Sequence, residues 1–331
     1  MEFSKLNRIF FALKTTIATH KPIHMRTTIV VFFLIVETVL GCHSINTKNN
    51  GMALRDTTPS QIDVIDREEG RVLQIDGRTK DFVDTIQWNS RARYVAVMDI
   101  PTHFFVNPGT MLLCNIGSGS IARTYIQQQW TVEVAEPDSS MIEMAETKFR
   151  AGISDTALVY ENGRNYLTTQ SAPYDIILID GIAPAHLPTE MLTKEFFTLV
   201  SSHIAKDGIL GIAVESVGWN DAIVQSIGAT LKEVFKDIIV LPIAEPPDKF
   251  GSIVILATNT NRNIVFDPNR NTSLDPEWRY GQEYQKTHAW DNHFTPDTHN
   301  GIILDDAFNR YDTMFTKLLD SSKTQPAEYI P

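Results

Sequence analysis

Residues 112–138 read LLCNIGSGSIARTYIQQQWTVEVAEPD, and this stretch decides the fold. An apolar strand leads into a turn that contains Gly117 and Gly119, a helix follows, and a second strand ends on the acid Glu136. Glycine lets the backbone approach a ligand closely. The acid can accept hydrogen bonds from both hydroxyls of a ribose. This order is typical of the nucleoside-binding half of a doubly wound α/β domain.

The composition argues against a nonspecific nucleic-acid-binding protein, a disulfide-stabilised protein and a protein with a cysteine metal site. The 331 residues carry a formal net charge of −11, which argues against nonspecific nucleic-acid binding because a phosphate backbone attracts a basic face. The two cysteines, Cys42 and Cys114, form neither a disulfide framework nor a C-x-x-C metal pair. We therefore expect no nucleic-acid partner and no metal. Cys114 falls inside the first predicted strand, where a buried and inert thiol is the usual state.

The N-terminal region has the pattern of an export signal. Residues 29–36 form an unbroken apolar run, which is too short for a comfortable transmembrane helix and suits the core of a signal peptide. The VLGC ending at Cys42 resembles a bacterial lipobox, with Cys42 as the lipidated residue, and Met25 is a plausible true start. An uncleaved anchor and a buried strand are the alternatives.

The N-terminal charges also predict a location. Five Lys and Arg residues precede the apolar run, so the positive-inside rule places the rest of the chain outside the cytoplasm. We expect residues 1–42 to be a lipoprotein signal and residues 43–60 to be a flexible tether, which together would anchor the protein to a membrane. A cytoplasmic location follows if the run is not a signal.

The region that follows the tether, residues 61–105, is predicted to be a small β-rich subdomain. Two strands, 71–75 and 82–88, flank a turn at Asp76-Gly77, and residues 91–98 have a helical pattern. The chain ends in an irregular extension over 261–331, with a final helix at about 304–319.

The central region, residues 106–260, alternates apolar runs with helical patterns. The seven predicted strands are residues 111–116, 131–136, 156–160, 174–180, 209–215, 237–242 and 252–257. This alternation predicts the α/β class, with a doubly wound and mainly parallel seven-stranded sheet. We expect the last two strands to form an antiparallel hairpin at one edge.

Four polar segments follow predicted strands at their carboxyl ends, where ligands bind in open α/β sheets. They are residues 117–120, 136–138, 161–163 and 180–184. This arrangement resembles that of S-adenosylmethionine-dependent methyltransferases and their relatives.

Within that group, the chain resembles the spermidine synthase family of polyamine aminopropyltransferases over about residues 71–257. The VLQIDG run at 72–77, the YDIILID run at 174–180 and the LDDA run at 304–307 are similar to family motifs. Tyr94 stands 23 residues before Gly117, which is the family's usual interval between its active-site tyrosine and its glycine loop. The resemblance implies a methyltransferase-like domain behind a small β-rich N-terminal domain.

The resemblance also implies a donor site. S-adenosylmethionine or its decarboxylated form would be the co-substrate, and no metal is required. Gly117 and Gly119 would form the loop around it, and Glu136 would bind the ribose. Asn162 would bind adenine, and Asp138 would lie near the methionine or ribose end.

On the acceptor side, the resemblance implies a small-molecule amine. Asp180 would act as the general base that takes a proton from the attacking amine, and Tyr94 would hold that amine through its hydroxyl. The expected reaction is transfer of an aminopropyl group. A homodimer is compatible with this organisation.

Four positions depart from the family pattern. Lys80 replaces a glutamine, Ser120 replaces an aspartate in the glycine loop, Asn162 replaces an acid, and Ala183 replaces the second acid of the loop after Asp180. Polyamine recognition depends on carboxylates that pair with ammonium groups, so these changes weaken the case for ordinary putrescine aminopropylation. Two alternatives stay open: a non-catalytic, membrane-tethered module that binds a ligand or a partner, and a methyltransferase with another acceptor.

Overall fold

The computed structural model describes residues 61–182, 189–243, 250–260 and 276–322. The predicted signal and tether, residues 1–60, lie outside this part of the chain, so their interpretation stays a prediction. Within the described residues, no helix combines the length and the apolar character needed to cross a membrane.

The N-terminal subdomain is a three-stranded antiparallel sheet formed by β1 (Ile62–Arg67), β2 (Gly70–Ile75) and β3 (Arg78–Val83). Asp76 and Gly77 connect β2 to β3, and both have positive φ angles, 52° and 73°. Two consecutive residues of this conformation form the type I′ turn that matches the twist of a hairpin. The predicted turn is therefore confirmed, whereas strand β1 was not predicted.

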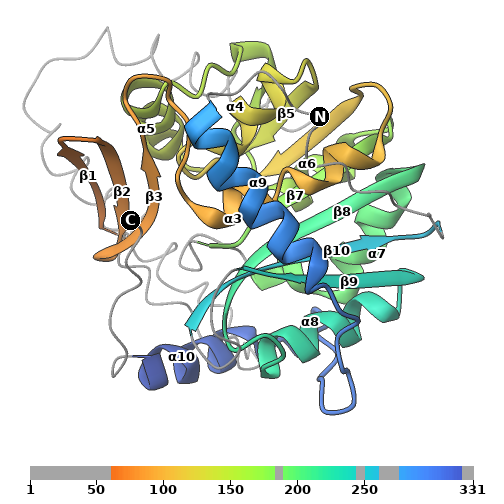
Figure 1. Ribbon diagram of the computed structural model, residues 1–331. Helices are drawn as coiled ribbons and strands as arrows, with labels where there is room; N and C mark the ends of the chain where they lie inside the picture. Colours follow the sequence, from red (N-terminus) through yellow and green to blue (C-terminus); the bar gives the residue numbers. More distant parts are fainter. Residues whose placement is uncertain (1–60, 183–188, 244–249, 261–275, 323–331) are drawn as a thin grey trace, which may run out of the picture. The chain divides into compact units, whose positions relative to one another are not determined.

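The central sheet has seven strands in the order β6-β5-β4-β7-β8-β10-β9 (Figure 1). The strands are β4 (Thr110–Cys114), β5 (Thr131–Ala135), β6 (Leu158–Val159), β7 (Tyr174–Asp180), β8 (Ile204–Val217), β9 (Asp237–Pro242) and β10 (Phe250–Thr258). Strands β4, β5, β6, β7 and β8 run parallel to one another, and β10 is antiparallel to both β8 and β9. The predicted mainly parallel sheet with an antiparallel pair at one edge is confirmed.

Helices alternate with these strands. The α-helices are α3 (Arg93–Val97), α4 (Ser120–Gln127), α5 (Ser139–Phe149), α6 (Gly163–Thr169), α7 (Lys194–His203), α8 (Ala222–Lys232), α9 (Pro276–Asp291) and α10 (Tyr311–Ser322). The described residues also form three 3₁₀ helices: η2 (Ile100–Phe104), η3 (Asp155–Ala157) and η4 (Thr189–Leu192).

The two faces of the central sheet belong to different cores, because successive side chains of a strand point to opposite faces. On β7, Ile176 and Leu178 join a core with β2, β3, α3, α4 and α5, whereas Ile177 and Ile179 join a core with α6, α7 and α8. Asp180 continues the first of these two sets. Its side chain therefore lies on the face that carries the N-terminal subdomain and α3.

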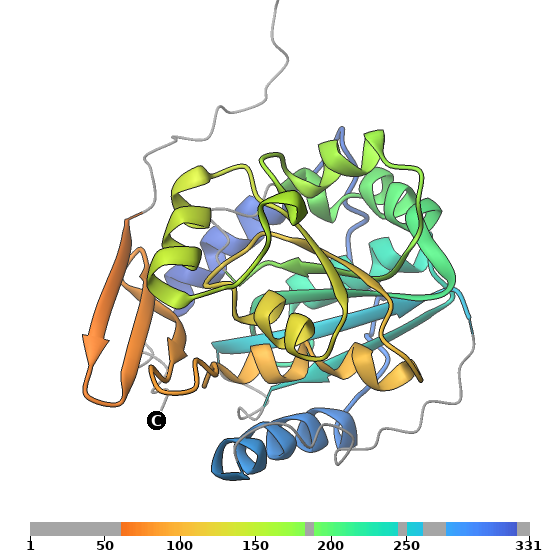
Figure 2. The same ribbon diagram turned by 90° about the horizontal axis from the view of Figure 1, so that it is seen from above.

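Helix α9 differs from the irregular structure expected between residues 261 and 300. It lies alongside α3 in both views (Figures 1 and 2). On this helix Lys286 is fully buried and forms an ion pair with Asp99, which also accepts a 2.6 Å hydrogen bond from Gln128. Of the helix residues whose burial is described, the polar Gln282 and Lys286 are buried together with Ala289, so the helix lacks the continuous apolar stripe by which helices are recognised in a sequence. The last helix also begins at Tyr311, later than the expected residue 304.

The Lys286–Asp99 pair predicts a large effect of one substitution. Burial raises the pKa of Asp99, but Lys286 and His103 outweigh burial and keep that pKa below its usual value. Lys286→Met keeps the apolar stem and leaves the Asp99 charge buried without its main counter-ion, so the free energy of unfolding should fall by about 3–5 kcal/mol. Urea denaturation measures this change.

The matched control is Lys194→Met, because Lys194 forms a 2.8 Å ion pair with Glu233 at the surface. Exposed pairs contribute little, so this variant should unfold at the wild-type urea concentration. Equal stability of the two variants would contradict the importance assigned to the buried pair.

Candidate nucleoside and amine site

The predicted glycine turn lies at the carboxyl end of β4. Gly117 and Gly119 have φ angles of +52° and +79°, which side chains rarely adopt. A Cβ atom on Gly117 would lie 2.9 Å from Asp180 Oδ2, and one on Gly119 would lie 2.3 Å from the Cβ of Ala151. Glycine is therefore required at both positions, by backbone conformation and by the close approach of neighbours.

Glu136 follows β5 and holds the turn in place. Its Oε2 accepts a 3.0 Å hydrogen bond from the backbone N–H of Ile116, and its Oε1 accepts one of 2.9 Å from Asp138. Burial raises the pKa of Glu136, and these two backbone donors offset part of the rise. Each carboxylate oxygen can accept a further bond, so the group keeps acceptor capacity for two ribose hydroxyls.

Asp138 and Asn162 both cap helices. Asp138 Oδ1 accepts a 2.8 Å hydrogen bond from the N–H of Ser140 at the start of α5, and Asn162 Oδ1 accepts one of 2.8 Å from Asn165 at the start of α6. Short polar side chains of this kind are preferred at the N-cap. The cap uses the carbonyl oxygen of Asn162, so its Nδ2 group is the part that could donate to an adenine ring.

The structure brings the two predicted catalytic residues together. Tyr94, on α3, donates a 3.2 Å hydrogen bond from its hydroxyl to Asp180 Oδ2, and the N–H of Ile182 donates to Oδ1 at 3.1 Å. Burial raises the pKa of Asp180 to about 6, although Ile182, Tyr94 and Lys80 favour its charged form. A carboxylate that titrates near neutral pH is suited to accept a proton from an amine.

A buried carboxylate that the sequence analysis missed, Asp81 on β3, contacts the glycine turn. It accepts hydrogen bonds from three serine hydroxyls: Ser90 at 2.5 Å, Ser120 at 2.6 Å, and Ser118. Arg123 donates to Ser120 at 2.9 Å. The family resemblance predicts an acid at position 120, where this chain has a serine. The carboxylate of Asp81, from another part of the chain, lies beside this loop instead.

A second missed acid, Glu215 on β8, pairs with cations of the N-terminal sheet. Its Oε1 accepts 2.8 Å contacts from both Lys80 Nζ and Arg78 Nη2. Burial lowers the pKa of Lys80, and Glu215 offsets part of this shift. From the sequence alone, Lys80 is one of the changes that weaken the case for putrescine as the acceptor. The structure instead pairs it with a buried carboxylate 135 positions away.

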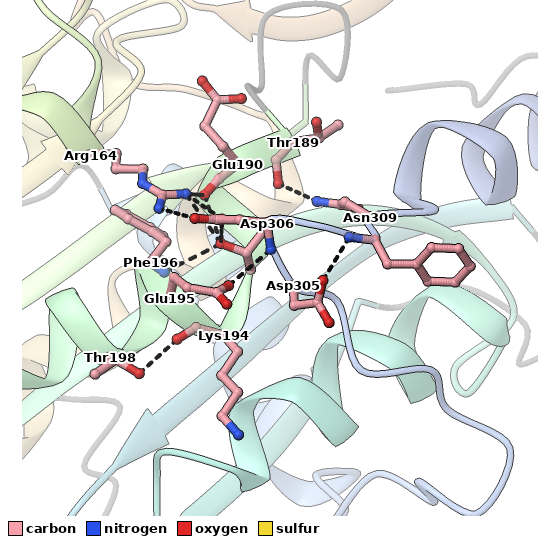
Figure 3. Close-up of polar contacts among 12 residues, drawn as sticks. Arg164, Thr189, Glu190, Lys194, Glu195, Phe196, Thr198, Asp305, Asp306 and Asn309 are labelled. Atoms are coloured by element: carbon pink, nitrogen blue, oxygen red, sulfur yellow. Dashed lines mark hydrogen bonds and ion pairs between the residues drawn. The ribbon is translucent and has the colours of Figure 1, made fainter. Parts of the chain in front are cut away.

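The C-terminal segment before α10 forms hydrogen bonds and an ion pair with helices α6 and η4 (Figure 3). Arg164 on α6 forms two parallel hydrogen bonds, of 2.7 and 2.5 Å, with the carboxylate of Asp306. Thr193 donates to the same carboxylate at 2.7 Å, and Asn309 donates to the carbonyl of Thr189 at 2.7 Å. We call this set of contacts the Asp306 latch. It fixes the first turn of α6, which follows directly from the candidate adenine ligand at position 162.

Three further observations concern the described chain outside the candidate ligands. A pocket of about 420 Å³ lies at the opposite end of β8, where its lining includes Ile209, Leu256 and Trp290. Burial, with a smaller effect of Glu136, raises the pKa of the Cys114 thiol to about 12, as suits the inert residue expected there. The part of the chain that the structure describes contains no group of three or more side chains placed to hold a metal ion.

The Asp306 latch predicts a local change in stability. Asp306→Asn replaces a bidentate ion pair with neutral contacts and should lower the free energy of unfolding by about 1 kcal/mol, a small value because the carboxylate is 41% exposed. Amide hydrogen exchange at the start of α6 should become faster. Asp305→Asn is the matched control, because the neighbouring carboxylate of Asp305 accepts a 2.6 Å hydrogen bond from the backbone N–H of Phe308 within its own turn. Equal exchange in the two variants would contradict the latch.

Comparisons with known proteins identify the family and the fold of this chain. The family described as spermine/spermidine synthase domain matches residues 95–267 of the 331. The polyamine aminopropyltransferase of Moorella thermoacetica is 23% identical over 269 residues, which cover 78% of this chain and 89% of that protein. The polyamine aminopropyltransferase of Methanocaldococcus jannaschii is 26% identical over 262 residues, or 74% and 82% of the two chains.

Solved structures show the same fold. The spermidine synthase of Thermotoga maritima aligns with a TM-score of 0.54 at 19% identity and covers 66% of this chain and 77% of that one. A probable spermidine synthase from Corynebacterium glutamicum gives a TM-score of 0.53 at 20% identity, covering 65% and 81%. The methyltransferase-like α/β domain behind a three-stranded subdomain is thus confirmed. Because the family model matches more than half of the chain and the fold agrees, the chain belongs to the spermine/spermidine synthase family as a divergent member.

Proposed function

We propose that this protein transfers an aminopropyl group from decarboxylated S-adenosylmethionine to an amine. The observation that carries the proposal is the hydrogen-bonded pair of Tyr94 and Asp180 beside Gly117. It places a proton acceptor next to the loop that would hold the donor. Glu136, with acceptor capacity left on both oxygens, supports the placement of the ribose.

The reaction needs positioning and one proton transfer. The amine nitrogen attacks the propyl carbon next to the sulfonium, so a C–N bond forms while the C–S bond breaks. The bonding electrons go to sulfur, and methylthioadenosine leaves. The acceptor is an ammonium ion at neutral pH and has no free lone pair, so Asp180 accepts one proton from the nitrogen before this attack, and the product nitrogen keeps its other two protons as a secondary ammonium. Because the sulfonium is already a good leaving group, orientation of the two substrates is the protein's main contribution.

The donor's charge favours the ionised form of the base. In the free protein, burial disfavours the charge of Asp180 and raises its pKa to about 6. A sulfonium cation placed beside it would favour the carboxylate and lower the pKa. Donor binding would therefore prepare Asp180 to accept the proton before the amine attacks.

Calorimetric titration tests the donor site. The purified protein should bind methylthioadenosine and decarboxylated S-adenosylmethionine, and Glu136→Ala should weaken both at least about tenfold because charge-assisted hydrogen bonds are lost. Glu143→Gln, an exposed change on α5, is the control and should bind like the wild type.

Two outcomes would redirect the proposal. If a folded sample binds none of these nucleosides, the transferase assignment fails and the non-catalytic alternative gains support. Tighter binding of S-adenosylmethionine than of its decarboxylated form would instead favour a methyltransferase.

The raised pKa of Asp180 predicts a pH dependence. A general base must be deprotonated, so kcat/KM should rise with pH through about 6, the value of the free protein. The acid limb of kcat should lie at lower pH, since kcat reports the complex that contains the sulfonium. Asp180→Asn should remove the acid limb and most of the activity, whereas Tyr94→Phe should move the limb to higher pH because the charged form loses a hydrogen bond. An acid limb that survives in Asp180→Asn would assign the base to another group.

A further inference from the structure

One carboxylate oxygen of Glu215 lacks a hydrogen-bond donor among the residues that the structure describes. Its Oε1 accepts from Lys80 and Arg78, whereas its Oε2 is buried and accepts no hydrogen bond from the residues that the structure describes. The residue is only 5% exposed. A buried carboxylate oxygen without a donor is costly, so each such atom in a native protein requires an explanation. A ligand that donates to Oε2 would supply one.

The position of Glu215 suits the far end of the acceptor. Asp180 pairs with Ala213 across the parallel strands β7 and β8, and Glu215 lies two residues beyond Ala213 on the same face. Two residues of a strand span about 7 Å. A short linear amine could therefore place its nucleophilic nitrogen at Asp180 and its other end at Glu215.

The charged groups around Glu215 limit the chemical group that the acceptor can carry at its far end. Lys80 and Arg78 both lie 2.8 Å from Oε1, so two cations already share one carboxylate. An ammonium group at Oε2 would add a third cation in a place where burial strengthens the repulsion between like charges. An anionic group would be repelled by the negative charge of Glu215 itself. A neutral donor such as a hydroxyl satisfies Oε2 without either conflict.

We propose that the acceptor is a primary amine whose far end is a neutral hydrogen-bond donor, of the amino-alcohol class, and that Lys80 excludes diamines by standing beside the Glu215 oxygen that receives this end. The inference rests on the proposed function, because it assumes that the nucleophilic nitrogen binds at Asp180. It assigns Lys80 as a specificity-determining residue.

Two acceptors of equal length test the proposal directly. The compounds are 4-aminobutan-1-ol and putrescine, which differ only in a terminal hydroxyl or ammonium. The protein, saturated with methylthioadenosine, is titrated with each in a calorimeter. We expect the amino alcohol to bind at least about tenfold more tightly. Lys80→Gln should reduce this preference at least about tenfold, because it removes the more deeply buried of the two cations.

Further variants separate a specific effect from a general one. Arg78→Gln removes the other cation from the same oxygen at a partly exposed position and should change the preference in the same direction, which keeps the test valid if Lys80→Gln does not fold. Lys206→Gln, an exposed lysine at the opposite end of β8, is the control and should keep the wild-type preference.

The results that would overturn the proposal are specific. They are equal or tighter binding of putrescine by the wild type, binding of neither amine, or an unchanged preference in both Lys80→Gln and Arg78→Gln. Failure of methylthioadenosine to bind is a different result, which counts against the proposed transferase function. In that case the same amine titrations without the nucleoside still decide whether Glu215 and Lys80 discriminate between the two ends.

Discussion

The buried carboxylate of Asp81 is the interaction on which the candidate site depends. Its bonds to Ser118 and Ser120 join the last strand of the N-terminal sheet to the glycine turn of the central domain. Polar groups buried to this degree are strongly destabilising when they lose their partners, so the two sheets are held in one relative position. That position brings Lys80, the residue before Asp81, to Glu215. Asp81 thus sets the positions of both the glycine turn and Lys80 beside Glu215.

The consequence is a site assembled on one face of the central sheet. Asp180 and Glu215 project from neighbouring strands, and residues of the first subdomain and α3 meet them from above that face: Tyr94 bonds to Asp180, and Lys80 to Glu215. The first pair consists of a base and a hydroxyl, and the second of an acid already shared by cations. Because the two pairs differ in charge, they suit chemically different ends of a single small molecule.

Local patterns were enough to predict the frame of this site. The YDIILID run forms β7 over the predicted residues, and Gly117, Glu136 and Asp180 lie at the carboxyl ends of the strands. Strand periodicity and glycine turns are properties of neighbouring residues, so they can be read from the sequence. Asp81 and Glu215 could not be found in this way. The partner of Asp81 at Ser118 and the partner of Glu215 at Lys80 are 37 and 135 positions away, and an isolated acid in a strand gives no local signal. Helix α9 was missed for a related reason, since its burial depends on the ion pair of Lys286 with Asp99.

The departures from the family pattern acquire a different meaning once their surroundings are known. Read alone, a serine at position 120 and a lysine at position 80 indicate lost carboxylates and lost function. In the structure, the serine binds the carboxylate of Asp81, so negative charge near the loop is retained from another strand. The lysine is neutralised by Glu215 at a buried position, where an unpaired charge would be too costly to keep. Both changes come with compensating partners. If the site had simply lost its function, nothing would require these buried groups to remain paired. The arrangement therefore favours a changed specificity over a loss of activity.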